Sequence, residues 1–582
     1  MVESKKALLN TDTYKTDKYY EDWDLKLDSN ENPYGASSAV INVIKNFDFS
    51  KIGFYPAYGK LLDKLADLTG ADCDNFILTN GCDEAINVVL NTFLDKEDEV
   101  LSFSPTFSMP AIYSKCAGAK FVEIPYKEKW IFDYETYIKN IGDKTKIIYL
   151  TSPNNPTGDI IPPLTVRNLL NNFKDKLVVL DCTYINYSSI QKEEYYKLAD
   201  EFENLVTVKS FSKDYALAGL RLGYIYSNKK NIKEIKKVIS PYSVNSMALY
   251  AGLAALEDIS YFENIKIKIK ESKEKLVSGI KEAGFKAYNT EANFILAEFE
   301  KKSDFIYQKL LNNKIKVKYF QKGLMAGFFR ITAPKSEDVG KIIEILKPKP
   351  LFIFDLDGVI FDVQNSYRLA IKNTFKYFTK KECSDEEIQA VKNLGNMSND
   401  WDVTAFLIKN KGINVSYKEV VEVFQNLFFN PLNSGSKGLI DNEELVFKKE
   451  FFEELTKTAD CAVFTGRPQN EAFYSLEKYG IKKYFSYFIC NEDVENNHKP
   501  SPYGLNKIKN ACLYTDIFYF GDTVDDIKAG IDAGIKVYGI IPPNAKCVNE
   551  TKEKLKSAGA NEIFEEPCDI IEKFLKKDVV CK

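Results

Sequence analysis

The segment Ser210–Tyr224, SFSKDYALAGLRLGY, combines an amine, two hydroxyls and a guanidinium. Lys213 can bond covalently to a cofactor aldehyde, and Ser210, Ser212 and Arg221 can hold a phosphate group. An amine beside a phosphate site is the arrangement that pyridoxal 5'-phosphate (PLP) requires. A serine three residues before a lysine is also common on protein surfaces, so this segment predicts a PLP site only together with others.

Three further segments supply groups that suit the ring of PLP. Asp181 ends the apolar run VVLD, where its carboxylate can pair with the protonated ring nitrogen. Tyr184 and Asn155, the latter in SPNNPTG, can donate hydrogen bonds to the ring oxygen, and Phe107 in SPTFSMP can stack on the ring. Each residue also has a structural alternative, because Asn155 can form a turn, Asp181 can cap an element and Phe107 can belong to the core.

The segment NGCDEAI, residues 80–86, follows the strand-like FILT and is expected to open a helix. The backbone amides of Gly81, Cys82 and Asp83 would then present a helix N-terminus to the cofactor phosphate. The joint occurrence of all these groups favours a cofactor site over the separate structural alternatives.

A second set of polar residues begins with FDLDGVIFD, which places Asp355 and Asp357 just beyond an expected strand. Two acids at this spacing can divide the work of phosphate transfer, one attacking phosphorus and the other protonating the leaving oxygen. Thr465 in VFTGRP can hold the phosphoryl group, and Lys499 in NHKPSP can offset the crowded negative charge. An Asp-x-Asp pair alone is a loose motif that often caps an element.

The segment FGDTVDDIKAG adds Asp522 and Asp526 to this set, with Asp525 as the local alternative to Asp526. Carboxylate oxygens are the ligands that Mg²⁺ prefers. We therefore predict a Mg²⁺ site made by Asp355, Asp357, Asp522 and Asp526.

Size, charge and cysteine usage restrict the class of protein. A chain of 582 residues is too long for one core, and two to four domains are expected. The net charge of −4 and the lack of a long apolar run give no reason to expect a nucleic acid or a membrane as partner. The start has no apolar core for a signal peptide, and the eleven cysteines form no CxxC pair, so we expect a reducing, cytoplasmic location. The single histidine, His498, excludes chemistry that needs a histidine pair.

Strand–loop–helix patterns fill both halves of the chain and predict an α/β fold, with a connector at residues 347–350, KPKP. We expect a first enzyme at residues 1–346 and a second at 351–582, with a helical cap inserted at about 365–455. The strand-like runs KIIYLTSP and VVLD in the first half, and LFIFD, CAVFTG and DIFYFGD in the second, each end on polar residues. Such loops gather at one edge of a parallel sheet, where ligands bind.

The first half, from about residue 28 to 346, resembles the fold-type I PLP-dependent aminotransferases, and among them the histidinol-phosphate aminotransferases. The resemblance is carried by LDSNENPYG, FYPAYG, SPNNPTG, VVLDCTYINYS, SFSKDYALAGLRLGY, SPYSVNSMA and FFRIT. It implies a large and a small domain, and a homodimer in which Tyr55 reaches the cofactor phosphate of the other subunit. It further implies that Asn32 and Arg330 bind the substrate, with Arg330 gripping a carboxylate or phosphate.

Two positions depart from that family. Cys182-Thr183 follows Asp181 where the family usually has Glu-Ala, and Lys318 in IKVKYF stands where a second anion-binding arginine is expected. Lysine keeps the positive charge but lacks the planar fork of arginine. We count Lys318 among the substrate-binding residues.

The second half, from about residue 351 to 577, resembles the haloacid dehalogenase superfamily, whose fold is a Rossmann-like domain with an inserted helical cap. The resemblance implies an aspartyl-phosphate on Asp355, with Asp357 as general acid and base. The second aspartate favours a phosphatase or phosphomutase over a dehalogenase. The segment SNDWDVTAFLI, residues 398–408, resembles a cap subgroup associated with histidine-pathway genes, although Trp401 can also be a core residue.

These resemblances suggest two consecutive steps on one phosphorylated metabolite. The first half would transfer an amino group between glutamate (returning 2-oxoglutarate) and a phosphorylated ketone, and the second would remove the phosphate. Histidinol phosphate fits both resemblances, while serinol phosphate and PLP-dependent decarboxylation of a phosphorylated amino acid remain alternatives. A PLP-binding regulator is the alternative outside enzymes, and the presence of both Lys213 and Asp355 counts against it.

Overall fold

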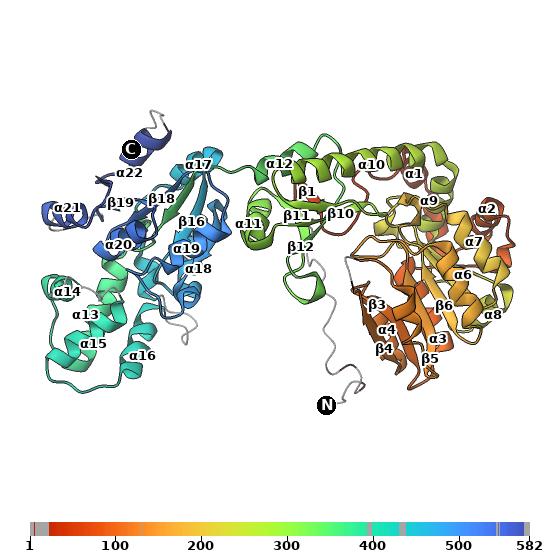
Figure 1. The fold of residues 1–582 in the computed structure, drawn as a ribbon, viewed down its shortest axis with the longest axis horizontal. Coiled ribbons are helices and arrows are strands. Elements are labelled where there is room, and N and C mark those ends of the chain that lie inside the picture. Colours follow the sequence, from red (N-terminus) through yellow and green to blue (C-terminus); the bar gives the residue numbers. More distant parts are fainter. Residues whose placement is uncertain are drawn as a thin grey trace. The chain divides into compact units, whose positions relative to one another are not determined.

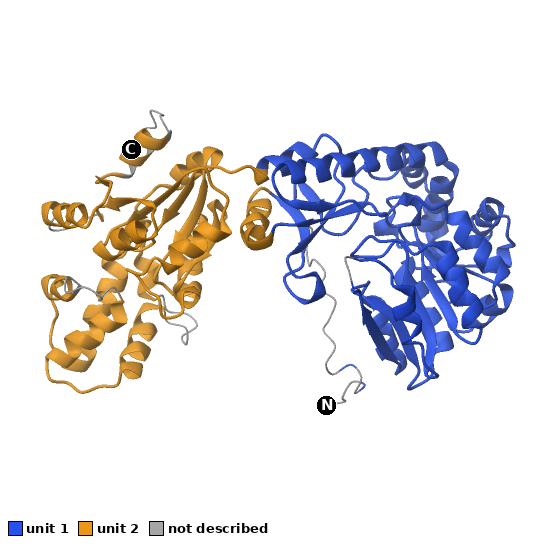
Figure 2. Ribbon diagram, in the orientation of Figure 1, with its two compact units in different colours: residues 1–299, 314–344 blue, residues 300–313, 345–582 orange. Residues whose placement is uncertain are grey.

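The computed structural model describes residues 5, 8, 22–127, 130–392, 399–429, 438–542, 545 and 548–575. Its chain divides into two compact units (Figure 2). Unit 1 contains residues 1–299 and 314–344, and unit 2 contains residues 300–313 and 345–582.

A seven-stranded sheet forms the centre of unit 1 (Figure 1). Its strands are mostly parallel, and only β8 runs antiparallel to its two neighbours. The central strands are apolar runs buried on both faces, as expected for a parallel sheet covered by helices. In sheet order the strands are β2 (Phe76–Thr79), β8 (Gly223–Ser227), β7 (Leu205–Ser210), β6 (Leu177–Asp181), β5 (Thr145–Thr151), β3 (Glu99–Ser104) and β4 (Lys120–Pro125).

Helices cover both faces of this sheet, and each face has its own cluster of buried apolar side chains. Helix α3 packs on one face through Ala85, Ile86 and Val89, and α6 packs on the other through Val166 and Leu169. The helices are α1 (Ser38–Lys45), α2 (Gly59–Thr69), α3 (Gly81–Phe93), α4 (Met109–Ala117), α5 (Tyr134–Ile138), α6 (Pro163–Asn172), α7 (Lys192–Glu201), α8 (Lys229–Ile235) and α9 (Ser246–Glu257).

A smaller, five-stranded sheet completes unit 1. In sheet order its strands are β1 (Leu25–Leu27), β11 (Ile315–Tyr319), β12 (Phe328–Thr332), β10 (Phe294–Glu298) and β9 (Lys286–Tyr288). The long helix α10 (Ile259–Glu282) packs on this sheet at β9 and β10, and α12 (Val339–Leu346) ends the sequence of the first half. The two sheets are those of the predicted large and small domains.

Unit 2 is built on a six-stranded parallel sheet. The predicted strands LFIFD, CAVFTG and DIFYFGD lie side by side as β13, β16 and β18, so their polar ends share one edge. The strands in order are β17 (Phe485–Ile489), β16 (Asp460–Phe464), β13 (Leu351–Phe354), β18 (Ile517–Gly521), β19 (Lys536–Ile540) and β20 (Glu562–Phe564). The sheet is flanked by α17 (Lys449–Thr458), α18 (Gln469–Lys478), α19 (Tyr503–Ala511), α20 (Val524–Asp532), α21 (Val548–Ser557) and α22 (Pro567–Leu575).

The predicted helical cap is present between two short strands, β14 (Phe361–Asp362) and β15 (Glu444–Leu445), which pair antiparallel. The cap helices can be followed in Figure 1. They share a separate apolar cluster that includes Phe375 and Phe424. The expected end at residue 455 falls beyond the cap, because Phe451 and Phe452 of α17 pack in the core of the sheet. Amphipathic periodicity marks a helix but not the surface on which it packs. The helices are α13 (Leu369–Thr379), α14 (Asp385–Lys392), α15 (Asp400–Asn410) and α16 (Tyr417–Phe428), and Ser398 lies outside the described residues.

The second departure from the predicted boundaries is helix α11 (Ser303–Asn312), which belongs to unit 2 although it precedes the expected connector. It packs on β17, and Lys309 Nζ forms a buried ion pair with Asp460 Oδ2 at 2.8 Å. Asn312 Nδ2 also donates to the carbonyl of Phe485 at 3.0 Å. Unit 2 is therefore formed by two separate stretches of the sequence, whereas the position of the connector predicted one continuous stretch.

Among the described residues, no helix has the length and apolar character needed to span a membrane.

We predict that Lys309→Met destabilises unit 2 by about 3–5 kcal/mol, because it leaves Asp460 buried and unpaired. Burial already raises the pKa of Asp460 and lowers that of Lys309, so each charge depends on the other. Trp401 is the tryptophan of unit 2, since Trp23 and Trp130 lie in unit 1. With Trp23 and Trp130 replaced by phenylalanine, the fluorescence of Trp401 during urea unfolding measures the stability of unit 2.

Lys554→Met is the matched control, because the exposed pair with Glu550 should contribute about 0.5 kcal/mol or less. The double variant Lys309→Met/Asp460→Leu should recover most of the lost stability. Equal unfolding midpoints for Lys309→Met and Lys554→Met would show that the buried pair does not support unit 2.

Candidate active sites

Asp181 lies at the carboxyl end of β6, in the middle of the large sheet of unit 1. Its Oδ2 accepts a hydrogen bond from Tyr149 Oη at 3.2 Å, and its Oδ1 accepts one from the Thr183 amide at 2.9 Å. Burial raises the pKa of Asp181 more than these hydrogen bonds lower it. Among the described residues the carboxylate has no ion-pair partner, so the site suits a ligand with a protonated ring nitrogen.

Lys213 and Arg330 lie close enough for their charges to interact in unit 1. Burial lowers the pKa of Lys213 to about 8, and the charge of Arg330 adds to this effect. Lys213 Nζ donates to the Ser29 carbonyl at 2.8 Å, so its position is fixed. Arg330 Nη1 donates to Asn155 Oδ1, which joins FFRIT to SPNNPTG. The structure thus brings three predicted residues to one place.

Arg221 faces the first turn of α3, where the cofactor phosphate was expected. Its Nη2 lies 2.9 Å from Asp83 Oδ2, and its φ of +56° is in the left-handed region that non-glycine residues rarely adopt. A Cβ on Gly81 would lie 2.5 Å from Arg221 Nη2, so the guanidinium would have to shift if another residue stood there. Ser210 ends β7, and its Oγ accepts from the Ser212 amide at 3.0 Å.

The remaining predicted cofactor and substrate residues hold the walls of the site together. Tyr184 Oη accepts from Asn30 Nδ2 at 2.9 Å, and Asn32 Nδ2 donates to the Asp214 carbonyl at 3.0 Å. Phe107 and Cys82 are partly buried against the cluster that contains α3. Lys318 is exposed and pairs with Arg330 across β11 and β12, with its Nζ 5.8 Å from the Phe320 ring centre.

Tyr55 is set apart from these residues in the single chain. Its side chain is 79% exposed and stacks on Tyr242, with 4.4 Å between ring centres. Phe54 and Ile52 beside it are also largely exposed. These three side chains form an exposed apolar segment of unit 1.

Sequence reasoning missed a buried network that holds the backbone beside Lys213. Lys209 Nζ forms a buried ion pair with Asp214 Oδ2 at 2.6 Å, and Asn186 Nδ2 donates to the same oxygen at 2.6 Å. Asp214 follows Lys213 directly, so the network positions the segment that carries the amine. Lys209 lies in β7, a strand whose residues are all buried. A lysine within such a strand usually has a buried partner, and this was the signal that could have revealed the network.

In unit 2, the side chains of Asp355, Lys499 and Asp526 meet at the carboxyl edge of the sheet. Lys499 Nζ lies 3.0 Å from Asp355 Oδ2 and 2.7 Å from Asp526 Oδ1. Burial raises the pKa of Asp355 to about 7, although Lys499 acts in the opposite direction. Asp526 is fixed at the start of α20 by a reciprocal capping interaction with Thr523.

A divalent cation fits this cluster, because carboxylate oxygens of Asp355, Asp522 and Asp526 all lie within 4.8 Å of one another. Gly358 has a φ of +72°, and a Cβ there would lie 2.3 Å from Asp522 Oδ2, so glycine makes room for the acid. Asp525 is outside the cluster, which favours Asp526 over its neighbour.

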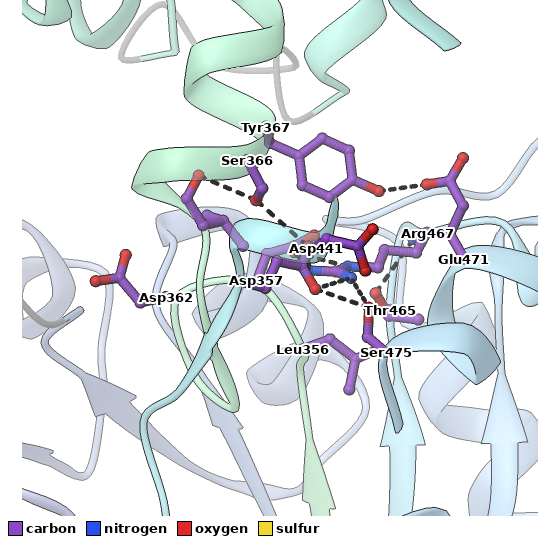
Figure 3. Close-up of polar contacts among 12 residues, drawn as sticks. Leu356, Asp357, Asp362, Ser366, Tyr367, Asp441, Thr465, Arg467, Glu471 and Ser475 are labelled. Atoms are coloured by element: carbon purple, nitrogen blue, oxygen red, sulfur yellow. Dashed lines mark hydrogen bonds and ion pairs between the residues drawn. The ribbon is translucent and has the colours of Figure 1, made fainter. Parts of the chain in front are cut away.

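The Asp357 side chain, predicted as a fourth metal ligand, lies outside this group of carboxylates. Its Oδ1 instead accepts from Arg467 Nε at 2.8 Å, two residues beyond Thr465 (Figure 3). Thr465 is buried at the end of β16, and its Oγ1 accepts from the Arg467 amide at 3.1 Å. Arg467 was not among the predicted site residues, since an arginine after a glycine carries no distinctive pattern.

Comparison with known proteins identifies relatives of the first half. The chain is 34% identical over 332 residues to histidinol-phosphate aminotransferase 1 of Carboxydothermus hydrogenoformans, covering 56% of this chain and 92% of that protein. It is 33% identical over 332 residues to the histidinol-phosphate aminotransferase of Methanocaldococcus jannaschii, covering 56% and 88%.

Solved structures support the same fold. The histidinol-phosphate aminotransferase of Clostridium acetobutylicum superposes with a TM-score of 0.52 at 25% identity, covering 56% of this chain and 98% of that one. The Sinorhizobium meliloti enzyme, solved in complex with PLP, gives 0.52 at 20% identity, covering 56% and 91%, and this likeness shows the fold.

Family models match both halves of the chain. The model for aminotransferase class I and II matches residues 24–346, and the model for haloacid dehalogenase-like hydrolases matches residues 352–540. The first match spans more than half of the chain, and the two site geometries lie within the matched regions. The chain is therefore an enzyme that belongs to the class I and II aminotransferases and carries a haloacid dehalogenase-like hydrolase domain in its second half.

Proposed function

We propose that the chain transfers an amino group from glutamate to a small phosphorylated ketone, with PLP as cofactor, and then hydrolyses the phosphate ester of the amine. The observation that carries this proposal is Lys213, an amine with a pKa of about 8 beside the anion-binding Arg330. The carboxylate cluster of Asp355, Asp522 and Asp526 in the same chain supports the second step.

In the aminotransferase half, PLP would withdraw electrons from the substrate α-carbon when bound. Asp181 would hold the proton on the ring nitrogen, since burial leaves its charge in need of a cation. Lys213 would move the proton at the α-carbon, because its lowered pKa suits an amine that works near neutral pH. Arg221 and the first amides of α3 would bind the phosphate, displacing the Arg221–Asp83 contact.

In the phosphatase half, Asp355 would attack phosphorus and become an aspartyl-phosphate. Asp357 would give a proton to the leaving oxygen and then take one from the attacking water. Lys499 and Thr465 would bind phosphoryl oxygens, since Lys499 lies 3.0 Å from Asp355 and Thr465 follows β16, the strand that pairs with β13. Mg²⁺ held by Asp355, Asp522 and Asp526 would offset the negative charge that gathers there.

A homodimer is part of the proposal. The exposed apolar side chains of unit 1 concentrate around the segment that carries Tyr55, which should reach the cofactor phosphate of a second copy. Six of the thirteen exposed large apolar side chains in the described part of unit 1 form this group, namely Phe49, Ile52, Phe54, Tyr55, Tyr242 and Tyr250.

Histidinol phosphate is the first candidate product of the transamination. The two relatives named for it match this chain over 92% and 88% of their own length. Serinol phosphate is the second candidate. It is favoured by Lys318, whose amine replaces an expected arginine fork and is exposed beside Phe320. Activity assays with both amines and 2-oxoglutarate, followed by phosphate release, test the two candidates.

The first prediction from this function concerns the amine of Lys213. In the PLP-free protein, the rate of covalent PLP uptake should rise with pH and be half-maximal near pH 8, because the protonated amine is not a nucleophile. Absorbance of the bound cofactor measures the rate. Lys213→Ala should show no covalent uptake, and a midpoint near the ordinary lysine value of 10.5 would contradict the assignment.

The second prediction separates the two activities. Asp355→Asn should reduce phosphate release by a factor of about 10³ or more while transamination continues, because the nucleophile is lost from one unit only. Asp525→Asn is the control, since this acid lies outside the cluster. Removal of Mg²⁺ with a chelator should reproduce the Asp355→Asn result, and parallel loss of both activities would argue against two independent sites.

The third prediction concerns Arg330 and Lys318. Arg330→Ala should weaken binding of glutamate and of the phosphorylated substrate by roughly 1.5–3 kcal/mol, about tenfold to a hundredfold, because both must use one anion site. Lys318→Arg should change KM for the phosphorylated substrate more than for glutamate. Kinetics of the two half-reactions measure both effects, and normal kinetics of Arg330→Ala would remove it from the site.

A further inference from the structure

Arg467 is buried in unit 2 next to the carboxylate proposed as general acid and base. Its exposed fraction is 2%, which is rare for an arginine and requires that its charge be paired. The residue lies in the loop after β16, two positions beyond Thr465. Its guanidinium is surrounded by groups from the outgoing and returning linkers of the cap.

The guanidinium binds two carboxylates at once (Figure 3). Nε and Nη2 both donate to Asp357 Oδ1, at 2.8 and 2.5 Å. Nη1 donates to Glu443 Oε2 at 3.1 Å, and Nη2 lies 2.9 Å from Glu443 Oε1. Ser475 Oγ lies 3.2 Å from Nη1 and donates to Glu443 at 2.7 Å. Burial by itself would lower the pKa of Arg467, but Asp357 and Glu443 outweigh it and raise the pKa.

The two carboxylates differ in what they can reach. The Glu443 side chain is fully buried, whereas that of Asp357 is 35% exposed. Every hydrogen bond that Asp357 accepts through its side chain in the described part of the chain ends on Oδ1. The fork of Arg467 therefore fixes one oxygen and leaves Oδ2 as the oxygen that can exchange a proton with a substrate.

The same contacts extend to the base of the cap. Phe361 in β14 and Tyr367 place their rings 5.3 and 5.0 Å from the Arg467 guanidinium carbon. Glu443 directly precedes β15, the returning linker, so Arg467 contacts both linkers. Tyr367 Oη also donates to Glu471 of α18 at 2.5 Å.

A second contact to Glu471 comes from the cap itself. Gln425 Nε2 in α16 donates to its Oε1 at 2.8 Å. Helix α16 of the cap, the linkers and Asp357 are therefore joined to Arg467 by hydrogen bonds, ion pairs and the contact of its guanidinium with the Tyr367 ring.

We propose that Arg467 is a positioning residue for the phosphatase step. It would orient Asp357 for proton transfer and link that orientation to the seating of the cap, and the proposal rests on the phosphatase function proposed above. A role in stability alone explains these contacts less well, because a buried ion pair gives little net stability. Glu443 would also neutralise Arg467 without the paired bonds to one oxygen of Asp357.

The orientation of Asp357 would affect both proton transfers of phosphate hydrolysis. Asp355 forms a bond to phosphorus as the bond to the leaving oxygen breaks, and the proton of Asp357 passes to that oxygen. Water then forms a bond to phosphorus and gives its proton to Asp357, while the bond to Asp355 breaks and inorganic phosphate leaves. The first proton transfer matters most for an alkyl phosphate, whose alkoxide is a poor leaving group.

The test compares an alkyl phosphate, serinol phosphate, with p-nitrophenyl phosphate, whose leaving group departs without a proton. Arg467→Met should lower kcat for serinol phosphate by about 10²-fold, within the range for lost general acid catalysis, with KM little changed. For p-nitrophenyl phosphate the loss should be about fivefold or less. Arg467→Lys keeps the charge without the fork, so its ratio of alkyl to aryl activity should fall between wild type and Arg467→Met.

Arg368→Met is the control, since this half-buried arginine binds Gln389 and no carboxylate of the site. It should keep the wild-type ratio. Thermal unfolding shows whether each variant folds, and Arg467→Met/Glu443→Gln replaces Arg467→Met if the single variant does not, because it removes both buried charges.

An equal fall on both substrates, a change confined to KM, or a wild-type ratio in Arg467→Lys would overturn the proposal. These results differ from failure of the phosphatase function itself. If that function failed, the wild-type enzyme with Mg²⁺ would hydrolyse none of the three substrates, serinol phosphate, histidinol phosphate and p-nitrophenyl phosphate.

Discussion

Both sites depend on a carboxylate that is buried at the end of a central parallel strand. Asp181 ends β6 and Asp355 follows β13, and burial raises the pKa of each. A carboxylate at such a place is costly unless a cation compensates for its lost hydration. The surrounding structure must therefore supply that cation or leave room for a ligand that does. This requirement explains why basic residues, glycines and helix starts converge on the same edges of the two sheets.

Unit 2 meets the requirement with two cations that each serve two acids. Lys499 contacts Asp355 and Asp526 through a single ammonium group, which places charge without fixing the geometry of either acid. Arg467 contacts Asp357 and Glu443 through a planar fork, which fixes direction as well as charge. The different partners suit the roles proposed above, a nucleophile that would move toward phosphorus and an acid that would point at one oxygen.

Unit 1 uses buried pairing to hold the segment around its reactive amine. The Lys209–Asp214 pair fixes the backbone next to Lys213, and Arg330 helps to keep the pKa of that amine low. The amine is thereby positioned through its neighbouring backbone and its pKa is lowered by burial and by a charge from β12. Unit 2 is assembled in a similarly indirect way, since α11 contributes Lys309 to its core from the sequence of the first half.

The sequence by itself determined the α/β class and the two enzyme families, and it predicted most of the candidate site residues. Apolar runs that end in Asp181, Asp355 and Thr465 specify strands with polar ends, and these signals are local. The tertiary structure decided which acids share a cation. Asp357 lies only two residues from Asp355, yet Arg467 turns it away from the carboxylate cluster, while Asp522 approaches through the space at Gly358. It also decided that α17 packs on the sheet and α11 on β17, because amphipathic periodicity identifies a buried face but not its partner.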